Sequence, residues 1–177
     1  CANGQLLFYR NYAVGRIFFV RTAGIICEYN PFHPGHRFQL QETRRRLGRD
    51  TGILCLMSGN YVQRGEPAIF DKWTRAEMAV HGGADLVLEL PLTIAVNAAG
   101  YFASGAVRCL HGLGGVDCLS FGSERGDLTA LQTAAVLLES PEFDPALRRQ
   151  LETGVSFARA RELALGDLGG EIGRAHV

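Results

Sequence analysis

The sequence has little cysteine, little lysine and no long apolar run, and each shortage argues against a class of protein. Its five cysteines lie at positions 1, 27, 55, 109 and 118, and no two of them form a C-x-x-C pair. This spacing argues against a zinc ribbon and against a thioredoxin-like redox site. An odd number of scattered thiols is typical of a reduced, cytoplasmic protein.

The formal net charge is zero, because the chain has 18 basic and 18 acidic residues. Lys72 is the single lysine, so the other basic residues are arginines. A neutral chain has no general electrostatic attraction for nucleic acid, so any such site must be local. No apolar run approaches the roughly 20 residues of a membrane-spanning helix. Arg10, Asn11 and Arg16 interrupt the apolar patches near the start, which argues against a signal peptide. We therefore expect a soluble protein without a membrane partner; no protein partner is evident either.

What is present is the composition of one globular domain: 177 residues, 47% hydrophobic and 20% charged. A chain of this length can bury a core without disulfides or metal. We expect residues 21–165 to form that domain. Residues 1–20 are interpreted as an extra upstream flank, with a start near Val20. The glycine-rich residues 166–177 are interpreted as a tail outside the domain.

Within residues 21–165, short apolar runs alternate with amphipathic stretches, which predicts strand–helix repeats and a parallel sheet. Asp71 is expected to cap a helix, Gly48 to end one and Pro91 to stop a strand. Trp73 is expected to anchor a helix against the sheet, with a stacking platform for a base as the alternative. The predicted strands are residues 22–27, 53–57, 86–90 and 116–121. The predicted helices are residues 36–47, 71–81, 98–113 and 127–139, then a helical hairpin of 144–153 and 155–165. The fold class is therefore α/β, a doubly wound Rossmann-like sheet followed by a hairpin.

The turn after the first strand carries the most specific chemistry. His33, Pro34, Gly35 and His36 form an H-x-G-H motif directly before a helix. A helix N-terminus favours phosphate, and two imidazoles can donate hydrogen bonds to phosphate oxygens. Gly35 leaves room for close approach of a nucleotide. We therefore predict that His33 and His36 stabilise the pyrophosphate leaving group in adenylyl transfer.

The turn after the second strand is long and polar. Its Ser58, Asn60 and Arg64 are candidate contacts to substrate or RNA. Two plainer readings stay open: Ser58 and Asn60 could simply stabilise the turn through bonds to the backbone, and Arg64 could be a solvated turn residue. Glu28 could orient a histidine or bind metal, but no second carboxylate ligand is evident and no metal site is predicted.

Four segments together resemble one known family. They are GIICEYNPFHPGH at residues 24–36, MSGNYVQRGEPA at 57–68, DKWTR at 71–75 and FGSE at 121–124. This set is similar to the bacterial tRNA(Met) cytidine acetate ligases, which belong to the nucleotidyltransferase superfamily. The second segment separates that family from the small-metabolite adenylyltransferases, which share the H-x-G-H motif and the fold.

The resemblance implies that ATP activates acetate as acetyl-adenylate, and that the acetyl group then passes to N4 of the wobble cytidine of elongator tRNA(Met). It implies ATP as the nucleotide, and magnesium could enter as the counter-ion of ATP. By the same resemblance, the residues expected to contact ATP are Ile26, Cys27, Glu28, Tyr29, Asn30, Pro31, Phe32, His33, Pro34, Gly35, His36, Arg37, Phe38, Gln39 and Gly122.

The chain departs from that family at its carboxyl end. Nothing after Leu165 matches the family segments that supply further ATP contacts and much of the tRNA surface, so we expect an amino-terminal part of a longer enzyme. Two alternatives stay open. One is an adenylyltransferase acting on a small phosphorylated metabolite, and the other is an inactive fragment that binds nucleotide weakly.

Overall fold

The computed structural model describes residues 5–10, 21–123, 126–169 and 175–176. It divides into two compact units, which are described separately. The sheet unit holds the described residues of Leu6–Gly122, and the helical unit those of Ser123–His176. The flank predicted for residues 1–20 and the tail predicted for 166–177 lie largely outside the described residues.

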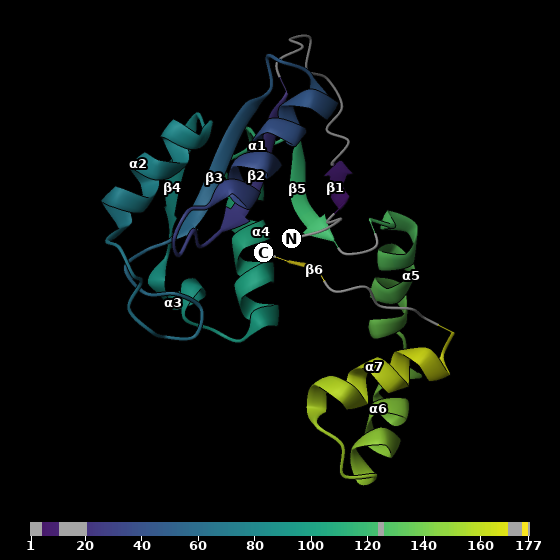
Figure 1. Ribbon diagram of the computed structural model, residues 1–177. Coiled ribbons are helices and arrows are strands. Elements are labelled where there is room, and N and C mark those ends of the chain that lie inside the picture. The colour runs from purple at the N-terminus through teal and green to yellow at the C-terminus, as the bar shows by residue number, and fades with distance from the viewer. Residues whose placement is uncertain (1–4, 11–20, 124–125, 170–174, 177) are drawn as a thin grey trace. The chain divides into compact units, whose positions relative to one another are not determined.

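The sheet unit is an α/β fold whose strand order reverses beside its first parallel strand (Figure 1). The strands lie in the order β1-β5-β2-β3-β4, and β2, β3, β4 and β5 run parallel. The chain moves outward from β2 to β4 and then returns to the other side of β2 as β5. This confirms the doubly wound sheet. The elements are β1 (Gln5–Arg10), β2 (Thr22–Cys27), α1 (Pro34–Leu47), β3 (Gly52–Ser58), α2 (Lys72–Gly82), β4 (Leu86–Leu90), α3 (Leu92–Ala95), α4 (Ala99–Gly112) and β5 (Cys118–Ser123).

Helices cover both faces of this sheet, because alternate strand residues point to opposite sides. On one face, Ile25 and Cys55 pack against Leu40 of α1 and Ala79 of α2. On the other face, a second buried cluster joins β3 and β4 to α3 and α4; its members are Leu54, Leu56, Leu90, Ala95, Phe102, Ala106 and Leu110. Strands β2 and β3 are therefore buried on both sides, as their continuous apolar composition predicts, whereas β4 buries Leu90 but exposes Leu86 and Glu89.

Three residues predicted to begin or end elements do so in the structure. Asp71 accepts hydrogen bonds from the N–H groups of Trp73 and Thr74 and begins α2. The N–H of Gly48 donates to the carbonyl of Arg44 at the end of α1. β4 ends directly before Pro91. These three assignments are confirmed.

Most element boundaries differ from the prediction by one or two residues. Helix α1 begins at Pro34 rather than at residue 36, because His33 supplies its cap. The stretch predicted as one helix over 98–113 begins at Ala99, and the short helix α3 precedes it. The fourth predicted strand lies two residues further along, at Cys118–Ser123.

The prediction that Trp73 anchors α2 against the sheet is wrong. Its side chain is 75% exposed, whereas Arg75 and Ala79 of the same helix are fully buried. Trp73 precedes Arg75 by two residues, which is about 200° of helical rotation, so the two side chains lie on opposite faces. The buried face of α2 is therefore set by positions 75, 79 and 82.

The helical unit contains α5 (Leu128–Leu138), α6 (Phe143–Glu152), α7 (Phe157–Asp167) and the two-residue strand β6 (Ala175–His176). Asp127 caps α5 and Ser156 caps α7. Its hydrophobic core cluster contains the buried residues Ala134, Phe143, Ala146, Ala164 and Leu165. Helices α6 and α7 confirm the predicted hairpin. None of the described helices of either unit combines the length and the apolar composition that a membrane crossing requires.

We predict that Gly82→Ala destabilises the protein by about 1–3 kcal/mol, the usual cost of overpacking a core. A Cβ at Gly82 would meet the ring of Phe32, whose nearest atom lies 2.2 Å away. Gly112 is the matched control, since it also ends a helix and has no neighbour within 4 Å of such a Cβ. Gly112→Ala should be neutral or stabilising by up to about 1 kcal/mol. Urea unfolding of both variants measures this, and equal effects would contradict the packing argument.

Candidate active site

The H-x-G-H turn lies where the strand order of the sheet reverses. It follows β2, and β5, the parallel neighbour of β2 on the side away from β3, ends near it. Loops that leave two adjacent parallel strands in opposite directions form a crevice at the carboxyl edge, which is where doubly wound folds bind ligands. The turn therefore occupies the ligand-binding position of this fold.

His33 and His36 cap helix α1 reciprocally. The Nδ1 atom of His33 accepts the Gly35 N–H at 3.1 Å, and Nδ1 of His36 accepts the His33 N–H at 3.2 Å. The two rings stack with their centroids 3.6 Å apart. Because a backbone N–H can only donate, both Nδ1 atoms are unprotonated acceptors. Each neutral imidazole must then carry its proton on Nε2, where it can donate to an anion.

His36 is held in its neutral form. Burial, and secondarily the neighbouring His33, together lower its pKa from 6.5 to about 4. The rings of Tyr29 and Phe32 pack against it, with centroid separations of 4.7 and 5.6 Å. At pH 7 the Nε2–H of His36 is therefore a neutral hydrogen-bond donor.

Gly35 has a structural role in this turn that the sequence analysis did not foresee. A Cβ at this position would lie 2.9 Å from Cε1 of His33, so the missing side chain leaves space for that imidazole. The Gly35 N–H, which belongs to the first turn of α1, donates to Nδ1 of His33 in this structure. The donors that remain for an anion at this turn are therefore chiefly the imidazole Nε2–H groups.

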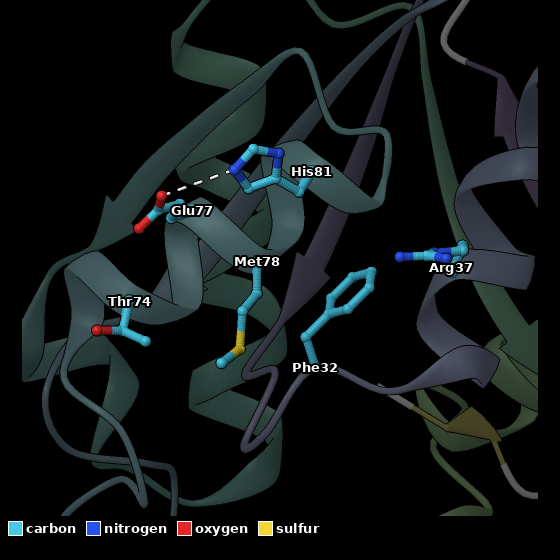
Figure 2. A pocket seen from close by; sticks show the side chains of 6 residues that line it. All are labelled: Phe32, Arg37, Thr74, Glu77, Met78 and His81. Carbon is cyan, nitrogen blue, oxygen red and sulfur yellow. Dashed lines mark ion pairs between the residues drawn. The ribbon is translucent and has the colours of Figure 1, made fainter.

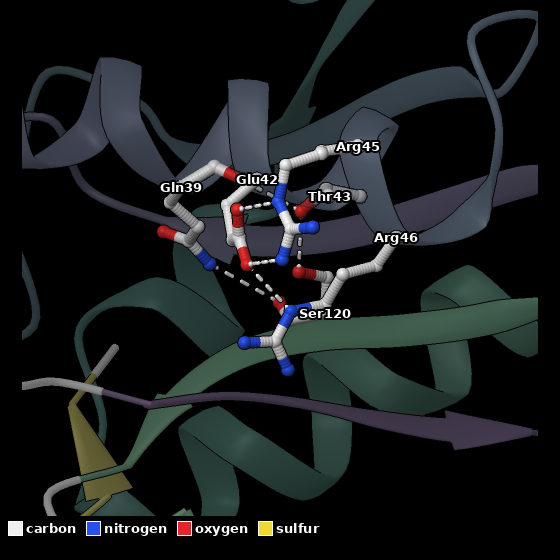
Figure 3. Close-up of polar contacts among 6 residues, drawn as sticks. All are labelled: Gln39, Glu42, Thr43, Arg45, Arg46 and Ser120. Carbon is white, nitrogen blue, oxygen red and sulfur yellow. Dashed lines mark hydrogen bonds and ion pairs between the residues drawn. The ribbon is translucent and has the colours of Figure 1, made fainter.

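Two polar contacts join α1 to β5, the strand that contains the predicted ATP contact Gly122 (Figure 3). Gln39 Nε2 donates to the carbonyl of Ser120 at 3.3 Å. The hydroxyls of Thr43 and Ser120, both buried, lie 2.8 Å apart. Gln39 was predicted to contact ATP, and here it fixes the helix of the histidine turn against β5. The sequence analysis missed Thr43 and Ser120; the i, i+4 spacing of Gln39 and Thr43 is a signal for a shared helix face.

The three consecutive arginines near the end of α1, Arg44, Arg45 and Arg46, are engaged in ion pairs. Arg45 and Arg46 bind Glu42 at 2.6 and 2.7 Å (Figure 3), and their hydrogen bonds lower the pKa of that carboxyl to about 2. Arg44 binds Asp85 at 2.6 Å. This arrangement favours a solvated, self-compensated helix face over a phosphate-binding one.

Two predicted ATP contacts use their side chains to hold the second turn. Glu28 Oε1 accepts the Gln63 N–H at 2.6 Å, and Asn30 Oδ1 accepts the Ile69 N–H at 2.7 Å. Asn60 Oδ1 accepts the Lys72 N–H at 3.0 Å, so Asn60 does stabilise the turn through the backbone. The turns after β2 and β3 are therefore bound to each other by polar side chains.

The other two candidates of the second turn differ in access. Ser58 is fully buried, and its hydroxyl has no hydrogen-bond partner among the described residues. Arg64 is exposed, next to Gly65, which has a φ of +79°. Arg64 is thus the side chain of this pair that a ligand could reach.

The remaining predicted ATP contacts surround the turn. Ile26 and Cys27 end β2, with Cys27 buried. Pro31 is half-buried in the turn, and Pro34, Arg37 and Phe38 are exposed at the start of α1. Tyr29 is buried and has a φ of +47°, and its hydroxyl contacts Cys55 Sγ at 3.4 Å. Apart from Gly122, the predicted set is thus one continuous segment from β2 into α1.

A groove of about 300 Å³ lies beside the turn, between α1 and α2 (Figure 2). Phe32 and Arg37 line one side, and Thr74, Glu77, Met78 and His81 line the other. The sequence analysis did not connect these α2 residues with the turn. Among the described residues, no three His, Cys, Asp or Glu side chains gather as metal ligands.

Comparison with known proteins gives results that agree with this geometry. A model of the HIGH nucleotidyltransferase family matches residues 20–175. The tRNA(Met) cytidine acetate ligase of Acetivibrio thermocellus is 51% identical over 148 residues, which are 82% of this chain and 35% of the relative. The protein of the same name from Thermoanaerobacter sp. (strain X514) is 54% identical over 144 residues, 80% of this chain and 36% of the relative.

A solved structure is also similar. The crystal structure of Thermotoga maritima TmcAL bound with alpha-thio ATP has a TM-score of 0.75 and 40% identity, covering 86% of this chain and 38% of that one. The chain thus spans little more than a third of the length of these relatives. The family match covers most of the chain, including the sheet, the H-x-G-H turn and the helical hairpin. The chain belongs to the HIGH nucleotidyltransferase family.

Proposed function

We propose that this chain forms the ATP-binding part of a tRNA(Met) cytidine acetate ligase. The observation that carries the proposal is the pair of stacked histidines at the strand-order reversal, whose Nε2–H groups remain available as donors. About half of the aligned residues are identical in ligases of that name, which supports this activity over others on the same fold.

The proposed reaction has two steps. An oxygen of acetate attacks the α-phosphorus of ATP, the bond to the β-phosphate bridging oxygen breaks, and pyrophosphate leaves with that electron pair. N4 of the wobble cytidine then attacks the acetyl carbonyl, AMP leaves, and N4 loses a proton. Both steps balance without a redox partner.

In the first step, negative charge develops on the departing pyrophosphate. Donors fixed in place before the reaction stabilise such charge without reorganisation. The reciprocal cap fixes both imidazoles, so His33 and His36 are the residues to which we assign this role. Gly122, at the end of β5, and the residue 26–39 segment would enclose the nucleotide. Magnesium could accompany ATP as its counter-ion.

Acetate and elongator tRNA(Met) are the proposed partners. Arg64 is the best candidate of the second turn for an anionic partner, because it is exposed and its planar guanidinium suits carboxylate or phosphate. The burial of Ser58 and the backbone bond of Asn60 favour structural roles for these two residues.

ATP–pyrophosphate exchange tests the proposed function. The assay is run on this chain and on its full-length form, with acetate, with a phosphorylated metabolite such as phosphopantetheine, and with neither. Exchange that requires acetate supports the ligase. Metabolite-dependent synthesis of pyrophosphate indicates the alternative adenylyltransferase, and ATP binding without exchange in either form indicates a nucleotide-binding fragment.

We predict that His33→Ala and His36→Ala each lower acetate-dependent exchange about 10²-fold, the scale of losing one preorganised donor. His111→Ala is the control, because His111 is exposed in the last turn of α4, away from the turn. Initial rates at saturating ATP measure the effect. Wild-type rates in both single variants would contradict the assignment of His33 and His36 to stabilisation of the leaving pyrophosphate.

We predict that His36 makes stability depend on pH between about 6.5 and 4. Its pKa is about 4 in the folded protein and 6.5 when unperturbed, so in this range the unfolded chain binds the additional proton. Stability contributed by neutral His36 is therefore present above pH 6.5 and lost as the pH falls toward 4. Urea unfolding at pH 7, 5.5 and 4.5 should show wild type losing stability relative to His36→Asn. A constant difference between the two would contradict the lowered pKa.

A further inference from the structure

Arg75 is a buried cation that binds main-chain carbonyls of three separate segments. Its side chain is fully buried in α2. Nη1 donates to the carbonyl of Glu28, directly after β2, and Nη2 donates to those of Ser58 and Gly59, at the end of β3. Nε donates to the carbonyl of Phe70, directly before α2, at 3.0 Å. The guanidinium therefore joins the carboxyl ends of two strands to the start of a helix.

Packing alone does not explain why a charged side chain occupies this buried position. Burial lowers the pKa of Arg75, which means that the surroundings disfavour its cationic form. An apolar side chain would fill the same space without that cost. An apolar side chain cannot donate hydrogen bonds to carbonyls in three directions, whereas the guanidinium of arginine can. The role that explains an arginine at this position is therefore to hold the three segments in place.

The carbonyl of Glu28 leads directly to the histidine turn. The next residue, Tyr29, has a φ of +47°, a left-handed conformation that a non-glycine residue adopts at a cost. Its ring lies 4.7 Å from that of His36. By fixing the peptide before Tyr29, Arg75 holds the ring against which His36 packs.

The other carbonyls delimit the second turn, residues 59–71. Gly59 begins this loop and Phe70 lies at its end, so the guanidinium closes its base. The bonds from Glu28 to Gln63 and from Asn30 to Ile69 hold the same loop against the first turn. Loop 59–71 carries Arg64, the exposed candidate for an anionic substrate.

We propose that Arg75 is a positioning residue, which fixes loop 59–71 and the Tyr29–His36 contact in the geometry that chemistry on bound ATP requires. The inference rests on the proposed function for its kinetic consequence, whereas the ordering of the loop stands independently. Arg75 reaches the reacting groups through its neighbours and is not assigned a contact to substrate.

The test compares Arg75→Lys with Arg44→Lys in the full-length protein. Lysine keeps the charge, but its three N–H donors share one nitrogen, so it cannot reproduce the bonds that Nε, Nη1 and Nη2 of Arg75 make in separate directions. Arg44 is the matched control, since it also bridges elements, binding the Gly83 carbonyl and Asp85 before β4, at the opposite edge of the sheet. We expect Arg75→Lys to lower kcat for acetate-dependent exchange by about 10- to 100-fold, the scale of a small misplacement, with KM for ATP little changed. Arg44→Lys should keep both constants.

Trypsin cleavage gives a readout that needs no activity. Arg64 is exposed in loop 59–71, and Arg49 is exposed in the turn after α1, so the same digest supplies a reference site. We expect cleavage after Arg64, relative to cleavage after Arg49, to rise at least about tenfold in Arg75→Lys and to stay unchanged in Arg44→Lys, because local opening controls cleavage. Mass spectrometry of the fragments measures it.

Wild-type kcat together with wild-type cleavage in Arg75→Lys would overturn the proposal, and so would equal losses in the two variants. If wild type shows no acetate-dependent exchange, the proposed function fails, while faster cleavage after Arg64 still supports the ordering role. Should Arg75→Lys not fold, hydrogen exchange of the wild type decides. Slow exchange of the Gln63 and Ile69 amides supports the proposal, and exchange at the rate of an open loop overturns it.

Discussion

The candidate site depends on the reciprocal cap between His33 and His36. A helix that starts at a sheet edge must satisfy its first N–H groups, and here the Nδ1 atoms of the two histidines contribute to this. The opposite side of each ring, the Nε2–H, is thereby fixed in direction and protonation. One pair of side chains therefore begins helix α1 and presents two donors to the crevice. Gly35 belongs to the same arrangement, because a side chain there would displace the His33 ring.

The sheet topology gives this cap its place. Since β5 returns beside β2 on the side away from β3, the H-x-G-H turn lies where the strand order reverses, the place at which doubly wound folds bind ligands. Gln39 and Thr43 bind Ser120, which couples α1 to the strand that contains Gly122. On the other side, Glu28 and Asn30 bind the loop after β3. The histidine turn is thus held by contacts to β5 and to the loop after β3, and a displacement of either reaches it through one or two contacts.

The sequence is sufficient to predict those features that depend on local chemistry. Asp71, Gly48 and Pro91 act on their nearest backbone neighbours, so their roles follow from residue type alone, and the alternation of apolar runs predicts the parallel sheet. Features that depend on tertiary contacts cannot be predicted in this way. An aromatic residue is usually buried, yet Trp73 faces solvent because the buried face of α2 is occupied by Arg75, Ala79 and Gly82. That face has the i, i+4, i+7 spacing of a buried stripe, but an arginine within it is ordinarily interpreted as exposed, and only the carbonyls of distant loops explain it.

The polar residues around the turn therefore fall into two physical groups, although the resemblance to known ligases places most of them in one ATP-contacting segment. His33 and His36 present donors to the crevice, so their removal acts on charge in the reaction. Glu28 and Asn30 accept N–H groups of the half-buried Gln63 and the exposed Ile69 in the neighbouring loop, so their removal breaks these two bonds and loosens that loop. A rate measurement cannot distinguish the loss of a residue of one group from the loss of a residue of the other. Hydrogen exchange of the backbone can, because loosening the loop lowers the protection of the Gln63 and Ile69 amides, whereas removing an imidazole Nε2–H need not change that protection. A residue contacts ATP only if its donor points toward the nucleotide, so closeness to the H-x-G-H motif alone does not make a residue an ATP contact.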